Sequence, residues 1–188
     1  TVGAPRTVDE RERHKHTPPP PSPPSSVFMG DAFSKCVGAE APLYGPQYEH
    51  NVMFLCNHNS CRSQMADGWL RALRGSQSVG VASAGIVGGT AVKPGAITVM
   101  GEAGVDISKY TSDAISDFSP NDFDIVISCC GCGDKLNPAD KIAWKKRAVF
   151  QDWNLDDPPA IDPGDLSAYR RVRDEARAKV LQLLEMCE

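Results

Sequence analysis

The segment from Cys56 to Ser63, with the sequence CNHNSCRS, combines residue types that could bind an oxyanion and attack it with sulfur. It follows an apolar run, residues 52–55, that predicts a short buried strand. It precedes residues 64–73, whose large apolar side chains recur every four positions, as on one face of a helix. A loop between a strand and a helix N-terminus directs backbone N–H groups inward, and the helix dipole adds positive potential. The segment therefore predicts a cradle for a tetrahedral oxyanion.

Two side chains of this segment could act on a bound oxyanion. The guanidinium group of Arg62 is a planar fork that can pair with two oxygens. Cys56, in the positive field of the loop, is expected to be a thiolate at neutral pH and hence a nucleophile. The alternative is a buried structural cysteine followed by a surface arginine. The strand–loop–helix order, with Ser63 directly behind the arginine, favours catalysis.

A second group of thiols follows the expected strand 124–128 and consists of Cys129, Cys130 and Cys132. Gly131 permits the tight turn that a Cys130–Cys132 disulfide would need, and such a bond should be strained and easily reduced. The alternatives are a metal site or three inert buried cysteines. A structural zinc site usually takes four ligands from separated pairs, and no second Cys or His pair has a suitable spacing in the expected domain. We therefore expect no bound metal.

The composition restricts the class of protein. The chain has 188 residues, 41% of them hydrophobic, and a formal net charge of −4, so we expect neither nucleic acid nor an anionic membrane as its main partner. No apolar run approaches the roughly 20 residues that span a bilayer. The seven cysteines are unevenly spaced, unlike a secreted disulfide framework. We expect a reducing compartment, the cytoplasm, with import into an organelle as the alternative.

Residues 1–48 are expected to form a disordered, proline-rich tail. Six of the seven residues from 18 to 24 are prolines, which favour extended polyproline II and cannot form a packed core. The tail could be a spacer or a docking ligand for a partner. The folded domain is expected to comprise residues 49–188.

Strand and helix signals alternate along the domain, which predicts an α/β fold with a parallel sheet covered on both faces. Ligands of such sheets bind beyond the carboxyl ends of the strands, where the Cys56 loop and the second cysteine group both lie. A further helix is expected to begin near 111–113, where a serine or an aspartate could cap it. The expected strands are 52–55, 79–83, 124–128 and 148–150, and the expected helices are 64–73, 94–103 and 166–187.

Short motifs along the domain carry a resemblance to a known family. They are NSCRSQMA from Asn59, SAGI from Ser83, DIS from Asp106, TSD from Thr111, CGCG from Cys130, Asp152-Trp153 and Asp157-Pro158. In this order they are similar to arsenate reductase of the low-molecular-weight phosphotyrosine phosphatase fold, from about residue 51 to the C-terminus. The CGCG form is closest to the branch that draws electrons from glutathione and glutaredoxin. The resemblance implies a three-layer α/β/α architecture with a four-stranded parallel sheet.

The resemblance also implies a role for each site residue. Cys56 would be the nucleophile that attacks arsenate, and Ser63 would stabilise its thiolate. Arg62 would hold the oxyanion together with the loop amides. Asp157 would protonate the leaving oxygen, although an Asp-Pro pair alone is a common turn signal. The rest of this phosphatase-like P-loop would be Asn57, His58, Asn59, Ser60 and Cys61, of which Cys61 is expected to be structural.

The leading hypothesis is the reduction of arsenate to arsenite by a three-thiol relay, which would serve arsenic resistance without a bound cofactor. Cys130 would attack the sulfur of arsenylated Cys56 and release arsenite, and Cys132 would then form a redox-active disulfide with Cys130. An external thiol would reduce that disulfide, with glutathione and glutaredoxin expected rather than thioredoxin. Cys129 departs from the family pattern and offers alternative pairs with Cys130 or Cys132. We expect a monomer or a weak dimer.

Two other functions fit parts of the sequence. A low-molecular-weight protein tyrosine phosphatase would use the same cradle through a phosphocysteine at Cys56, without the later thiols. Such phosphatases tend to have a tyrosine after the Asp-Pro pair, where this chain has Pro159. Alternatively, the thiols could form a non-enzymatic redox or metalloid-binding module.

Overall fold

The computed structural model describes residues 1, 43–89, 91–158 and 165–188, and the described part of the folded unit lies within residues 43–188. Residues 2–42 of the expected tail lie outside the described residues, as does Pro159. None of the helices described is long and apolar enough to cross a membrane.

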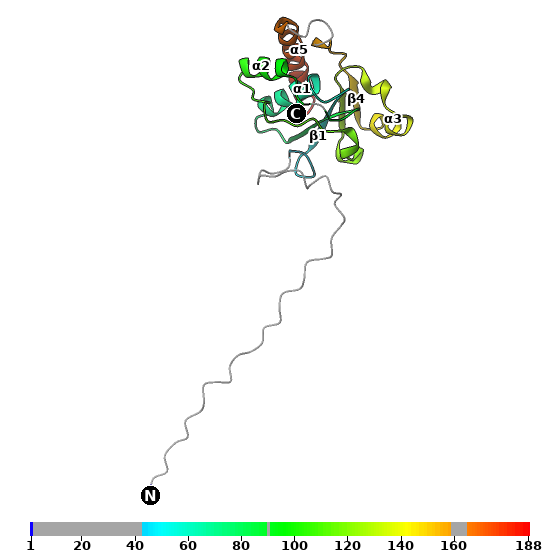
Figure 1. Cartoon of the computed structure of the whole chain (residues 1–188). Coiled ribbons are helices and arrows are strands. Elements are labelled where there is room, and N and C mark those ends of the chain that lie inside the picture. The colour runs from blue at the N-terminus through cyan, green and yellow to red at the C-terminus, as the bar shows by residue number, and fades with distance from the viewer. Residues whose placement is uncertain (2–42, 90, 159–164) are drawn as a thin grey trace. The chain divides into compact units, whose positions relative to one another are not determined.

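A parallel sheet of four strands forms the centre of the unit (Figure 1), and its strand order is β2-β1-β3-β4. Every strand pair is parallel, so the expectation of a four-stranded parallel sheet is confirmed. The register aligns the carboxyl ends, because Cys56 lies opposite Gly85 and Ser128 lies opposite both Leu55 and Asp152. The strands are β1 (His50–Cys56), β2 (Val79–Gly85), β3 (Ile125–Ser128) and β4 (Val149–Asp152).

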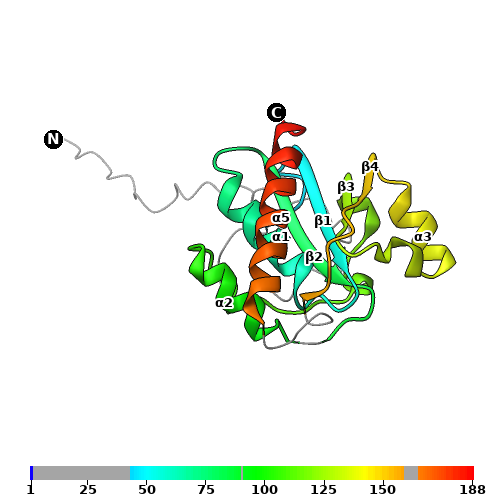
Figure 2. The same ribbon diagram turned by 90° about the horizontal axis from the view of Figure 1, so that it is seen from above.

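Helices cover both faces of the sheet, which gives the three-layer α/β/α architecture (Figure 2). Alternate residues of β1 point into two cores, as the pleat of a strand requires. Val52 and Phe54 pack with α1 (Arg62–Leu73), α2 (Pro94–Glu102) and α5 (Leu166–Glu185). Met53 and Leu55 pack on the opposite side, with Phe123 and with Trp144 of α3 (Pro138–Lys145). Burial on both faces explains why β1 is a continuous apolar run. The described residues also include the 3-10 helices Ile115–Asp117, Pro120–Asp122 and Cys132–Lys135.

The expectation that a helix begins at 111–113 is wrong. The first helical turn there starts only at Ile115, and Ala114 precedes it. The side chains that resembled a cap are used elsewhere: Ser112 Oγ donates to the backbone oxygen of Asn59 at 2.7 Å, and the Asp113 carboxylate accepts from Thr111 Oγ1 at 3.2 Å. A tertiary contact has therefore taken the place of a local cap.

Helix α3 was not expected, although its N-terminus carries a recognisable signal. Asn137 Oδ1 accepts a hydrogen bond from Asp140 N at 2.9 Å, and Pro138 occupies the first helical position. Asparagine as a cap and proline at the first position are both typical of helix starts.

At the end of α2, the expected stop is confirmed, because Gly104 has a left-handed φ of 80°.

Residues 43–48, which were expected to belong to the tail, pack on the domain. Val81 N of β2 donates to Leu43 O at 2.7 Å, which holds this segment against the edge strand of the sheet. The Tyr44 ring packs against Phe123, with 4.9 Å between the ring centroids. The domain therefore includes residues 43–48, which the sequence assigned to the tail.

Candidate active site

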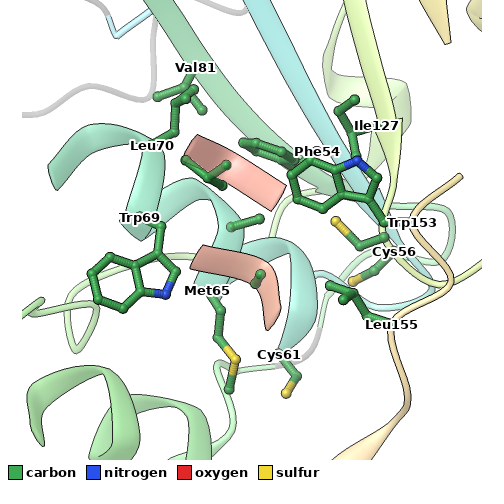
Figure 3. Close-up of a cluster of buried hydrophobic side chains, with 14 of the residues drawn as sticks. Phe54, Cys56, Cys61, Met65, Trp69, Leu70, Val81, Ile127, Trp153 and Leu155 are labelled. Carbon is green, nitrogen blue, oxygen red and sulfur yellow. The ribbon is translucent and has the colours of Figure 1, made fainter. Parts of the chain in front are cut away.

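The thiol of Cys56 lies at the carboxyl end of β1 and is 3% exposed. Its Sγ atom accepts the backbone N–H of Asn59 at 3.1 Å and lies 2.9 Å from Ser63 Oγ. The side chain is surrounded by apolar groups, and Figure 3 shows Leu155 and Trp153 beside it. The sulfur thus has one backbone N–H donor and one hydroxyl partner within hydrogen-bond distance.

Asn59 organises the loop between β1 and α1. It is fully buried and has a left-handed φ of 49°, which asparagine tolerates better than most residues. Its Oδ1 accepts from Asp113 N at 2.9 Å and from Gln64 Nε2 at 2.8 Å. Its Nδ2 is therefore the atom that donates to Ser63 Oγ, at 3.0 Å. Because that N–H occupies a lone pair of Ser63, the hydroxyl proton is free to point at the Cys56 sulfur.

Gly85 at the end of β2 lets the loop lie against the sheet. A Cβ atom at this position would be 2.8 Å from the carbonyl carbon of His58 and 2.9 Å from Asn59 N. The backbone pairing continues past the strand, since Ile86 N donates to Cys56 O at 2.9 Å. The end of β2 and the start of the loop therefore form one packed unit.

Within the loop 57–61, the His58 side chain is exposed, whereas Asn59, Ser60 and Cys61 are buried. Burial raises the pKa of Cys61 to about 12, so its thiol stays protonated.

Arg62 links the loop to the segment after β4. The residue is 8% exposed, and its NH1 donates to Leu155 O at 3.1 Å. Its NH2 forms an ion pair with Asp157 Oδ2 at 3.3 Å. Its Nε is buried and has no hydrogen-bond partner among the residues described. An unsatisfied N–H on a buried guanidinium is costly, so this group suits an anionic ligand that supplies an acceptor.

The second cysteine group lies at the same edge of the sheet as Cys56. Cys129 is fully buried, and its backbone continues the strand pairing: its N donates to Leu55 O and its O accepts from Leu155 N, both at 2.8 Å. Gly131 has a left-handed φ of 62°, which forms the turn that brings Cys130 and Cys132 together. Cys130 is half-buried, whereas Cys132 is fully buried.

The thiols of this group differ in acidity. A hydrogen bond from the Cys130 thiol is the main cause that lowers the pKa of Cys132 to about 7, against the opposing effect of burial. The same hydrogen bond, together with burial, raises the pKa of Cys130. Burial raises the pKa of Cys129 well above its ordinary value. Near neutral pH, Cys132 is therefore the thiol of this group that ionises.

The structure thus brings Cys56, Arg62, Ser63, Asp157 and the three later thiols to one edge of the sheet, as the strand order predicted. Sequence reasoning missed three residues that fix the loop from outside it: Gln64, Ser112 and Asp113. All three lie in motifs that carry the family resemblance. The last two, however, reach Asn59 across 53 and 54 positions of the chain, and such contacts leave no periodic signal. In the described part of the chain, no group of three or more His, Cys, Asp or Glu side chains is placed to hold a metal ion.

Comparisons with known proteins agree with this geometry. The model of the low molecular weight phosphotyrosine protein phosphatase family matches residues 51–188. A glutaredoxin arsenate reductase from Synechocystis sp. is 44% identical over 133 residues, which cover 71% of this chain and 95% of that protein. An arsenate reductase from Halalkalibacterium halodurans is 38% identical over 137 residues, which cover 71% of this chain and 94% of that protein.

Solved structures show the same relationship. A structure of an arsenate reductase in its phosphate-binding state superimposes with a TM-score of 0.65 at 40% sequence identity. The match covers 74% of this chain and 99% of that one. The resemblance seen in the motifs is therefore confirmed, and the chain belongs to the low molecular weight phosphotyrosine protein phosphatase family, where it groups with the arsenate reductases.

Proposed function

We propose that the protein reduces arsenate to arsenite through a thiol–disulfide relay of Cys56, Cys130 and Cys132, and that it serves arsenic detoxification. One observation carries this proposal. The Cys56 sulfur, held by Asn59 N and within hydrogen-bond distance of Ser63 Oγ, stands at the same sheet edge as a pair of thiols with opposite shifts in pKa. A phosphate-ester hydrolase needs only the first sulfur, whereas a reductase needs all three.

Arsenate binding is assigned to the loop amides and to Arg62. The Nε of Arg62 is buried without a hydrogen-bond partner among the described residues, so an arsenate oxygen would supply the missing acceptor. The ion pair with Asp157 holds the guanidinium and the carboxyl group together at the mouth of the loop. Asp157 is 42% exposed, so it can exchange protons with water between turnovers.

The first steps consume arsenate and yield arsenite. The Cys56 thiolate attacks As(V), a sulfur–arsenic bond forms, and an oxygen departs as water with a proton from Asp157. Cys130 then attacks the Cys56 sulfur. The new sulfur–sulfur bond replaces the sulfur–arsenic bond, and arsenic leaves with that electron pair as As(III). Two thiol sulfurs have been oxidised, and arsenic has gained two electrons.

The remaining steps restore the enzyme. The Cys132 thiolate attacks Cys130, which forms the Cys130–Cys132 disulfide and frees Cys56 as a thiolate. Two external thiols then reduce the disulfide. The similarity to a glutaredoxin arsenate reductase supports glutathione and glutaredoxin as the donors rather than thioredoxin. Such a donor requires a reducing compartment, and we propose the cytoplasm.

The phosphatase alternative is not favoured. The fold and the oxyanion loop are shared with phosphatases, but the similar proteins from Synechocystis sp. and Halalkalibacterium halodurans are arsenate reductases, as is the solved structure. Weak hydrolysis of phenyl phosphate is compatible with the relay, since the loop alone can form a phosphocysteine. A metalloid-binding module without turnover would bind arsenite quantitatively, whereas the relay predicts that pre-reduced protein releases arsenite from arsenate in a single turnover.

The test is steady-state arsenate reduction with glutathione and glutaredoxin by the Cys130→Ser and Cys132→Ser proteins. We expect both to lose steady-state turnover. Cys187→Ser is the matched control, because Cys187 is a half-buried thiol beyond the end of α5, and it should keep full activity. Full steady-state activity of both relay variants would overturn the proposed function.

A further inference from the structure

Ser128, the last residue of β3, is fully buried and lies beside the sulfur of Cys132. Its Oγ lies 3.4 Å from Cys132 Sγ, within the longer hydrogen-bond distance that sulfur allows. The same Oγ accepts the backbone N–H of Gly133 at 3.1 Å. The serine is thus fixed by the backbone turn that follows the thiol it faces.

The direction of the Ser128–Cys132 hydrogen bond follows from the partners of the serine. The N–H of Gly133 occupies a lone pair of the Ser128 oxygen, and this leaves the hydroxyl proton to be donated. A thiolate can only accept, so an ionised Cys132 must receive that proton. The arrangement repeats the one at Cys56, where an N–H of Asn59 donates to Ser63 Oγ and Ser63 faces the sulfur.

We propose that Ser128 is a positioning residue that stabilises the Cys132 thiolate in both steps of the relay that involve this sulfur. The inference rests on the proposed function and extends it to a residue outside the three thiols and the oxyanion loop. The hydroxyl of Ser128 is also one of the causes that lower the pKa of Cys132, after the larger contribution of the Cys130 thiol.

The first step that the Ser128 hydroxyl assists is the attack of Cys132 on the Cys56–Cys130 disulfide. A bond forms between the sulfurs of Cys132 and Cys130, and Cys56 leaves as a thiolate. Because the thiolate is the nucleophile in such exchanges, a donor that favours ionisation of Cys132 increases the reactive fraction.

The second step is reduction of the Cys130–Cys132 disulfide by the external thiol. In the reduced structure Cys130 is half-buried and Cys132 fully buried, so the external thiolate attacks the Cys130 sulfur. The electron pair of the broken bond goes to Cys132, which leaves as a thiolate. A second external thiol then releases Cys130. Thiols of lower pKa leave faster, so the same Ser128 hydroxyl assists this step.

The experiment measures the equilibrium constant for reduction of the Cys130–Cys132 disulfide by glutathione, at pH 6 and at pH 9, in the full chain. Differential alkylation followed by mass spectrometry quantifies the disulfide. For Ser128→Ala we expect this constant to be about tenfold lower than in the unmodified protein at pH 9, because a hydrogen bond to a charged group is lost. At pH 6 we expect equal constants, because Cys132 is then a thiol in both proteins.

Two further variants separate this role from a structural one. Ser83→Ala removes a buried serine hydroxyl from β2 and should leave the constant unchanged at both pH values. Ser128→Thr keeps the hydroxyl and should restore the constant at pH 9. An equal change at both pH values in Ser128→Ala, or no change at pH 9, would overturn the role of Ser128. If the unmodified protein forms no Cys130–Cys132 disulfide, the relay itself is wrong, and the inference fails with it.

Discussion

Ser63 Oγ lies 2.9 Å from Cys56 Sγ, and its proton can reach that sulfur because Asn59 Nδ2 donates to the same oxygen. Asn59 is in turn oriented by the backbone N–H of Asp113. A chain of hydrogen bonds therefore runs from a segment after α2, through the loop, to the nucleophile. The orientation of the Ser63 hydroxyl beside the sulfur therefore depends in part on a residue outside the loop.

The first prediction concerns Asn59. Asn59→Ala removes one donor and one acceptor from a fully buried network and places alanine in a left-handed conformation. We expect a loss of about 3 kcal/mol in the free energy of unfolding, from the unpaired groups and the backbone strain together. Urea denaturation followed by circular dichroism measures it.

Asn154→Ala is the control for this variant, since Asn154 also has a left-handed φ, of 50°, but is exposed. It should lose only about 1 kcal/mol, the cost of the backbone conformation. Equal losses in the two variants would show that the buried hydrogen bonds of Asn59 contribute nothing to stability.

The second prediction concerns the pH dependence of thiolate formation in the fully reduced protein. Since a hydrogen bond from the Cys130 thiol lowers the pKa of Cys132 to about 7, its thiolate fraction rises as pH rises through that value. Between pH 6 and pH 8 this fraction should increase by about tenfold and then level off. The ultraviolet absorbance of thiolates measures it, as the difference between the unmodified protein and Cys132→Ser. The Cys187→Ser protein should show the same profile, and a difference that is flat over this range would contradict the assignment of Cys132 as the thiol that ionises.

The third prediction concerns Cys129, which the sequence offered as an alternative resolving thiol. The structure shows it fully buried, with its pKa raised by burial, so it is a poor nucleophile. We expect Cys129→Ala to retain steady-state arsenate reduction and to lose only about 1 kcal/mol of stability through the small cavity. Loss of turnover in a folded Cys129→Ala protein would place this sulfur in the relay.

The fourth prediction concerns Arg62. Lysine cannot reproduce the planar fork that bonds Leu155 O and Asp157 and leaves Nε for a ligand. We expect Arg62→Lys to lower kcat/KM for arsenate by roughly 100-fold. Arg171→Lys is the control, because Arg171 pairs with Asp156 at 2.8 Å on the exposed surface nearby, and it should change kcat/KM little. Similar losses in both variants would argue that general surface charge, rather than the fork, binds arsenate.

The sequence predicted those elements whose burial produces a regular pattern of apolar residues along the chain. β1 is buried on both faces and therefore appears as an apolar run, and α5 shows its buried stripe at helical spacing. The carboxyl-edge placement of Cys56 and the later thiols followed from strand order alone. The loop motif also singled out Arg62 and Ser63, and the structure places Ser63 beside the Cys56 sulfur and Arg62 against the segment after β4.

The features that could not be predicted from the sequence depend on contacts between segments that are distant in the chain. The Ser112 hydroxyl could cap a helix, but it donates to the backbone oxygen of Asn59 instead, and the side chain of Asn59 accepts from Asp113 N. The role of Ser128 depends on the turn that brings Gly133 and Cys132 back to the end of β3. Helix α3 was missed although Asn137 and Pro138 signalled it, because its eight residues carry only two large apolar side chains, Ile142 and Trp144, too few for a helical period.

The close approach of Gly85 to the backbone of His58 and Asn59 means that this loop conformation requires glycine at this position of the sheet. Gly85 lies opposite Cys56 in the register, so the nucleophile faces a residue without a side chain on the adjacent strand. Transplanting residues 56–63 into another parallel sheet would require glycine at the facing position of the neighbouring strand. A host protein with any larger residue there would displace the loop and lose the anion cradle, however faithfully the eight residues were copied.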